Sequence, residues 1–207
     1  MKGLIRNERG SWPLVYTLIV FPLMMLLWVS NNTQIHSTTA SDLDIQPALA
    51  LAARSAAGQV VPVSNASNNP RVHADNAHST FKKILAKNLG LDEVTLNPLP
   101  GSNIKRPDYT FVVYNVDETF NIDGANGGKV YKFQNGILNT FTFSPTGTSY
   151  LFGVDNANIS PGVAGTLKCK MDSPGVVVSM SAELNRVMGK DPIIVNRWAA
   201  AKLVKVN

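Results

Sequence analysis

The stretch that decides the fold lies near the start of the chain, at residues 12–29, and reads WPLVYTLIVFPLMMLLWV. None of these side chains carries a charge. At helical rise the run is just long enough to cross the hydrocarbon core of a bilayer. Trp12 and Trp28 lie at its two ends, where tryptophan favours the headgroup zone. We therefore expect a transmembrane helix over residues 11–30.

The residues before this run predict which way it would face. Lys2, Arg6 and Arg9 lie on one side of it only, and positive charge of this kind stays in the cytoplasm. The predicted organisation is a basic cytoplasmic leader over residues 1–10, the transmembrane helix over 11–30, a stalk helix over 31–62 and an extracytoplasmic domain over 63–207. The predicted location is the cell membrane, with a single pass and the C-terminal domain outside.

Three interpretations of the N-terminal segment compete. A cleaved secretory signal needs small residues before the cut; Ser30 suits that position, but Trp28 is too large two positions earlier. The second interpretation is an ordinary single-span anchor, which is retained whole. The third is a prepilin-type leader, in which the cut falls before the apolar run and the run stays in the mature protein.

Arg9-Gly10-Ser11, followed by an apolar run containing Phe21-Pro22-Leu23, resembles the class III signal of type IV pilins and TadE-like pseudopilins of the bacterial cell surface. The resemblance implies cleavage by a prepilin-type peptidase between Gly10 and Ser11. It also implies membrane lipid and other pilin-like subunits as partners, in a surface filament. One departure matters: Val15 stands where such pilins usually carry the Glu that pairs with a neighbouring subunit's N-terminus. This favours a minor or accessory subunit over one that builds a long homopolymer.

Two helices are predicted beyond the apolar run. Ile45, Leu49 and Ala56 recur at helical spacing. Ser41 and Asp42 are candidate caps, and if Asp44 caps instead, Pro47 falls in the first turn, where proline is tolerated. The pilin-like resemblance implies that this segment joins the apolar run as one long, bent stalk. A second, amphipathic helix follows, with Asn69 as cap, Pro70 at its first position and Gly90 just past its end.

The rest of the chain predicts strands. They are expected over 93–96, 109–116, 129–133, 137–143, 176–184 and 193–206, with residues 144–165 as loop. Asn135-Gly136 between apolar runs predicts a tight hairpin, and alternation over 176–184 predicts a strand with one solvated face. The fold class expected is α+β, with the second amphipathic helix packed on an antiparallel sheet.

Few residues suggest chemistry. Ser79 and Lys82 match a four-residue nucleophile pattern without its companion motifs. The only histidines, His36, His73 and His78, lack a zinc-site spacing and are interpreted as surface or capping residues. The loop around Asp123 is rich in oxygen donors but lacks the bidentate Glu of an EF-hand, so turn chemistry and calcium binding both remain open.

Composition narrows the class of function. The chain has 207 residues, a net charge of +5 and one cysteine, Cys169. It therefore has no disulfide framework, and its mild charge, without a run of like charges, does not predict nucleic-acid binding. We expect no catalytic residue, no cofactor and no small-molecule substrate. The expected function is structural and non-enzymatic, as a pilin-like subunit of a filament or secretion apparatus. The alternative is a membrane-anchored extracytoplasmic binding module.

Overall fold

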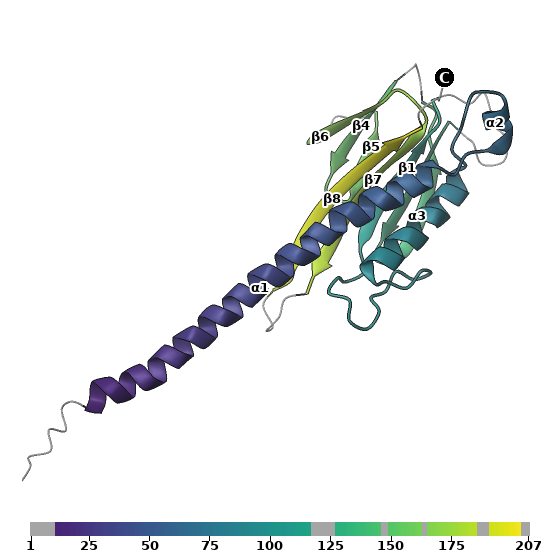
Figure 1. The fold of residues 1–207 in the computed structure, drawn as a ribbon. Coiled ribbons are helices and arrows are strands. Elements are labelled where there is room, and N and C mark those ends of the chain that lie inside the picture. Colours follow the sequence, from purple (N-terminus) through teal and green to yellow (C-terminus); the bar gives the residue numbers. More distant parts are fainter. Residues whose placement is uncertain (1–10, 117–126, 146–148, 163–164, 186–190, 204–207) are drawn as a thin grey trace, which may run out of the picture. The chain divides into compact units, whose positions relative to one another are not determined.

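The computed structural model describes residues 11–116, 127–145, 149–162, 165–185 and 191–203. The chain divides into two compact units, Met1–Ala40 and Ser41–Asn207, and each is considered by itself. The helices are α1 (Ser11–Ala57), α2 (Pro62–Ala66) and α3 (Ala74–Leu89) (Figure 1). Within the described residues, no helix has a stretch that is both long and apolar enough to cross a membrane.

Two antiparallel sheets make up most of the second unit. The larger contains β1 (Asp108–Tyr114), β2 (Gly128–Gln134), β3 (Ile137–Thr142), β7 (Gly175–Leu184) and β8 (Ile193–Lys202), in the order β3-β2-β1-β7-β8. The smaller contains β4 (Tyr150–Asp155), β5 (Asn158–Pro161) and β6 (Leu167–Met171), in the order β5-β4-β6. The predicted α+β class with an antiparallel sheet is confirmed.

The second unit has three layers, with the five-stranded sheet in the middle. On one face of this sheet, the C-terminal part of α1 and all of α3 lie over the strands (Figure 1). The core on that side includes Leu49 of α1, Phe81 of α3 and Phe111 of β1. On the other face lies the three-stranded sheet, and Tyr114 and Phe152 belong to the separate core that joins the two sheets.

The predicted solvated face of β7 is wrong over the first half of the strand, which the three-stranded sheet covers, whereas Ser181 and Glu183 further along stay half-buried. Val177 and Ser179, which alternate with the core residues on the helix side, are buried under the three-stranded sheet. The prediction failed because residues 144–165 were expected to be loop, whereas they contain β4 and β5. The covering layer therefore could not be foreseen.

The second helix ends where predicted but begins later. Gly90 takes a left-handed φ of 65° just after Leu89, as the C-terminal signal requires. At the other end His73, rather than Asn69, is the N-cap: its Nδ1 accepts a hydrogen bond from the Asn76 backbone N–H. Residues 69–72 do not join α3, because Val72 is held in an isolated β-bridge with Val60.

Three further predictions of local structure have different outcomes. The hairpin at Asn135-Gly136 is confirmed, with φ of 51° and 83° at the two positions. The strand expected at 93–96 is wrong, because the Asp92 carboxylate accepts hydrogen bonds from the N–H groups of Val94 and Thr95 and folds the segment into a turn. A separate helix starting near Asp44 is not found: α1 runs continuously from Ser11 to Ala57, as the single long stalk of the pilin-like alternative does, and Pro47 lies in its interior.

Candidate functional site

The most unusual surface of the chain is the first part of α1. From Leu23 to Val29 seven consecutive apolar side chains are 49–67% exposed, and Tyr16, Leu18, Ile19 and Phe21 before them are 61–69% exposed. Consecutive residues point about 100° apart around a helix, so the exposed apolar surface surrounds the helix. A helix that is apolar all round belongs inside a large core or a membrane.

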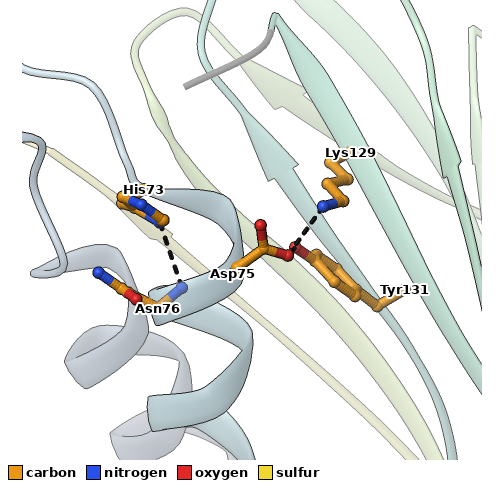
Figure 2. Close-up of polar contacts among 5 residues, drawn as sticks. All are labelled: His73, Asp75, Asn76, Lys129 and Tyr131. Carbon is orange, nitrogen blue, oxygen red and sulfur yellow. Dashed lines mark hydrogen bonds and ion pairs between the residues drawn. The ribbon is translucent and has the colours of Figure 1, made fainter. Parts of the chain in front are cut away.

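A polar cluster lies where α3 begins against the sheet (Figure 2). The Asp75 carboxylate accepts hydrogen bonds from Lys129 Nζ at 2.8 Å and from the Tyr131 hydroxyl at 2.7 Å. Asp75 is in the first turn of α3, where a negative charge also favours the helix dipole, and both partners come from β2. The bond to Lys129, followed by the bond to Tyr131, lowers the pKa of Asp75.

His78 lies one turn further along α3 and is buried. Its ring stacks on Tyr131 with centroids 4.1 Å apart, and its Nε2 is 2.9 Å from the Tyr109 hydroxyl. Burial, with Lys82 as a smaller contributor, lowers its pKa to about 4, so the ring is neutral near pH 7. The interpretation of the histidines as surface or capping residues fits His73, although the expected cap is Asn69. It is wrong for the buried His78, whose burial the helical phase shared with Phe81 and Leu85 could have revealed.

The Asp75–His78 cluster attaches α3 to the sheet. Its hydrogen bonds satisfy the polar groups of α3, β1 and β2 against one another, and the two cavities described next are not lined by its residues. Burial also raises the pKa values of Tyr109 and Tyr131, which keeps both phenols protonated as hydrogen-bond donors. We interpret the cluster as a structural attachment of the helix.

Two adjoining cavities lie along β8, with volumes of about 190 and 610 Å³. They share Leu167, Asn196, Arg197 and Trp198 as lining. The smaller lies between the two sheets and includes Asp155 and Ser179; the larger extends to Gln46 and Arg54 of α1. Trp198 is 36% exposed. We call this the β8 groove. Arg197 and Trp198 are neighbours on β8, so their side chains leave opposite faces of the strand: Arg197 pairs with Met180 on the face toward the helices, and Trp198 pairs with Ser179 on the other face. The amides and guanidinium groups along the groove suit a polar ligand.

The residues that the sequence singled out do not converge on one site. Gly10 and Asp123 lie outside the described residues, so the cleavage site and the calcium loop stay predictions; Ser11 is the first residue of α1. Ser79 is exposed, whereas Lys82 donates to the Val94 carbonyl. Cys169 is buried between the sheets, and burial raises its pKa. In the described part of the chain, no group of acidic, His or Cys side chains is arranged to hold a metal ion.

Comparisons with protein-family models, with curated proteins and with solved structures give no match to this chain. Function must therefore be argued from the helix, the groove and the sheet themselves.

Proposed function

We propose that this protein is a non-enzymatic, pilin-like minor or accessory subunit, held in the cell membrane by the N-terminal half of α1 with its α+β domain outside. The observation that carries the proposal is the apolar surface around Tyr16–Val29. Exposing so many apolar side chains to water is unfavourable by roughly 25 cal/mol for each Å², and hydrocarbon removes that cost. The exposed side chains that the structure describes begin at Tyr16, but the uncharged sequence begins four residues earlier, at Trp12, so the proposed membrane segment covers residues 12–29.

The leader supports the pilin-like form of the proposal. Arg9-Gly10-Ser11 precedes the run, and cleavage there would leave Ser11 as the mature N-terminus while keeping the apolar helix. Val15 argues for an accessory place. Without an acidic side chain at that position, the new N-terminal charge of a neighbouring subunit has no partner in a buried helix contact, and an unpaired buried charge costs several kcal/mol.

The N-terminus of the protein purified from its own host tests this proposal. A mature chain that begins at Ser11 supports the pilin-like subunit, and a chain that keeps Met1 supports a plain anchor. A chain that begins beyond Ser30 would refute both, because the apolar helix would have been removed.

Substitutions in the leader give a matched test of processing. We expect Gly10→Val to leave an uncleaved precursor in the membrane, because the peptidase needs a residue without a side chain before the cut. Gly3→Val adds the same side chain within the leader, away from the junction, and serves as the control. Equal gel mobility of the Gly10→Val variant and the wild type would remove the argument for a prepilin leader.

The alternative function is a membrane-anchored binding module, and the β8 groove is the observation that favours it. Arg54 and Arg197 line its larger cavity, and their guanidinium groups suit anionic groups of a cell-wall or surface polymer. Titration with an acidic polysaccharide tests this alternative. We expect Trp198 fluorescence to change and the change to weaken in Arg54→Gln; no response in the wild-type protein would exclude the groove as such a site.

A further inference from the structure

The two edge strands of the five-stranded sheet, β8 and β3, differ in how far other parts of the chain cover them. At the β8 edge, Gln46 of α1 donates from Nε2 to the Trp198 carbonyl, which occupies a backbone acceptor of that strand. The opposite edge is β3, whose six residues are all exposed. Ile137 is 64% exposed, and Phe141 is 49% exposed. An exposed edge of this kind can pair with another strand.

The backbone direction of β3 follows from one hydrogen bond. The Phe143 N–H donates to the Gly128 carbonyl at 3.0 Å, so 128 and 143 form a hydrogen-bonded pair in the β2–β3 register. Such pairs alternate along an antiparallel ladder. The backbone groups of Ile137, Asn139 and Phe141 therefore face β2, and those of Leu138, Thr140 and Thr142 face the open edge.

Proteins usually protect an open edge with charged side chains, proline or a bulge. The β3 sequence, Ile137–Thr142, contains neither a charged residue nor proline, and its pairing with β2 is continuous over all six residues. A strand without charge meets a second copy of itself without repulsion, which distinguishes a self-partner from a charged peptide.

We propose that β3 is a homodimer interface, in which the β3 strands of two copies pair antiparallel about a two-fold axis through Asn139. The two five-stranded sheets then become one continuous sheet. In this register Leu138 of one copy and Thr140 of the other exchange backbone hydrogen bonds on both sides of the axis. Ile137 faces Phe141 of the second copy, also on both sides.

The positions of the apolar side chains select this axis. Ile137 and Phe141 are each two residues from Asn139, so both fall in non-hydrogen-bonded pairs, where Cα atoms are about 4.5 Å apart and side chains pack closest. An axis through Thr140 would also satisfy the backbone, but it would place Phe141 against Asn139. It would also leave Ile137 against Phe143, which already packs in the core between the sheets.

Engineered cysteines test the register in the full chain, reconstituted in detergent micelles. In a Cys169→Ala background, Asn139→Cys brings two thiols into a directly opposed pair, with a Cα separation that a disulfide spans. Thr140→Cys is the matched control: its copies lie about 8 Å apart, because each faces Leu138, and this is beyond disulfide range. We expect disulfide dimers to form at least tenfold faster from Asn139→Cys under mild oxidation.

Two further substitutions test whether the edge itself makes the contact. Thr140→Pro removes an N–H that faces outward and leaves the bonds to β2 intact, as an edge strand tolerates. Phe141→Lys puts a charge into the apolar pair. Each should reduce dimers of Asn139→Cys at least tenfold while the unfolding transition is kept, and Phe141→Lys alone decides the matter if the proline variant fails to fold.

Three results would overturn the proposal. Equal cross-linking of the two cysteine variants would indicate random collision or association through α1. Absence of dimers from Asn139→Cys would mean that the edge is open or taken by another partner. Persistence of those dimers in a folded Phe141→Lys variant would show that β3 is not the interface.

Discussion

At the scale of single residues, buried polar side chains hold the layers together. Thr110 of β1 donates to the Ala157 carbonyl at 2.6 Å, and Ser179 of β7 donates to the Asn156 carbonyl. Thr110 and Ser179 are opposite each other in the β1–β7 register, so they form one polar patch on an otherwise apolar face. The patch receives the turn between β4 and β5, and it fixes where the three-stranded sheet attaches.

We expect Thr110→Val to lower the free energy of unfolding by roughly 1–3 kcal/mol, because the half-buried Ala157 carbonyl would be left without its donor. Denaturant unfolding measures this loss. Thr80 of α3 is half-exposed, so Thr80→Val makes the same chemical change at a less buried position and serves as the control. A similar loss in both variants would contradict the role assigned to Thr110.

The pKa of His78 makes the stability of the domain depend on pH. Its pKa falls from 6.5 to about 4 on folding, so the unfolded chain binds the proton between these values and the folded chain does not. Stability is therefore complete above pH 6.5 and lost as pH falls toward 4. At 1.36 kcal/mol for each pH unit, the loss is roughly 3 kcal/mol.

His78→Phe tests this dependence, since it keeps a ring against Tyr131 and removes the titrating group. Asp75, Lys82 and Lys129 are the charged groups that influence His78, and the lowered pKa of Asp75 costs stability only below pH 3.8. We expect the unfolding free energy of His78→Phe to be nearly flat from pH 6.5 to 4. A slope equal to that of the wild type would assign the dependence to another group.

At the scale of elements, the β2–β3 hairpin is the feature that the sequence predicts best. Gly136 has a φ of 83°, and a Cβ there would lie 2.6 Å from the Arg106 guanidinium. We expect Gly136→Val to destabilise the domain by roughly 1–3 kcal/mol, the range for strain at such a backbone position. Asn135→Gly, which relieves a positive φ at the neighbouring position, is the control and should be close to neutral. A change in Gly136→Val within experimental error would reject the strain at this turn.

Elements with a local signal could be predicted from the sequence, whereas those fixed by distant contacts could not. The end of α3 at Gly90 and the turn at Asn135-Gly136 both need a positive φ, and the residues at these positions are ones that adopt it readily. The start of α3 has no such local signal: Asn115, far along the chain, accepts from the Val72 N–H and donates to its carbonyl, at 2.8 and 2.9 Å, and so holds Val72 extended.

The two candidate functional surfaces, the apolar run and the β8 groove, also differ in whether the sequence could reveal them. The uncharged run at residues 12–29 was evident from sequence, since it is contiguous. The β8 groove was not, because Arg54, Asp155 and Trp198 come from different elements that only the fold brings near one another. The three-stranded sheet was missed because β4 and β5 are short and are separated by the turn at Asn156, which has a φ of 49°.

At the scale of the whole molecule, the two halves of α1 differ in how their apolar side chains are buried. Between Tyr16 and Val29 its large apolar side chains are exposed, except the half-buried Val20, whereas Ile45, Leu49, Ala52, Ala53 and Ala56 are completely buried in the core of the second unit. The sequence pattern changes accordingly, from continuous apolar residues to helical periodicity. The same helix therefore provides the proposed anchor and part of the domain's core.

This division predicts opposite results for two truncations. A chain that begins at Ser41 keeps the whole core, so we expect it to be folded and water-soluble, with an unfolding temperature within a few degrees of the full chain in detergent. A chain that begins at Gly58 loses five fully buried side chains. Removing a single large one, such as Leu49, costs about 2–5 kcal/mol, against a total stability of about 5–15 kcal/mol for a typical domain. We expect the shorter chain to lack a cooperative unfolding transition in circular dichroism. A folded chain from Gly58 would show that α1 is dispensable for the core, and an unfolded chain from Ser41 would show that the anchor segment contributes to it.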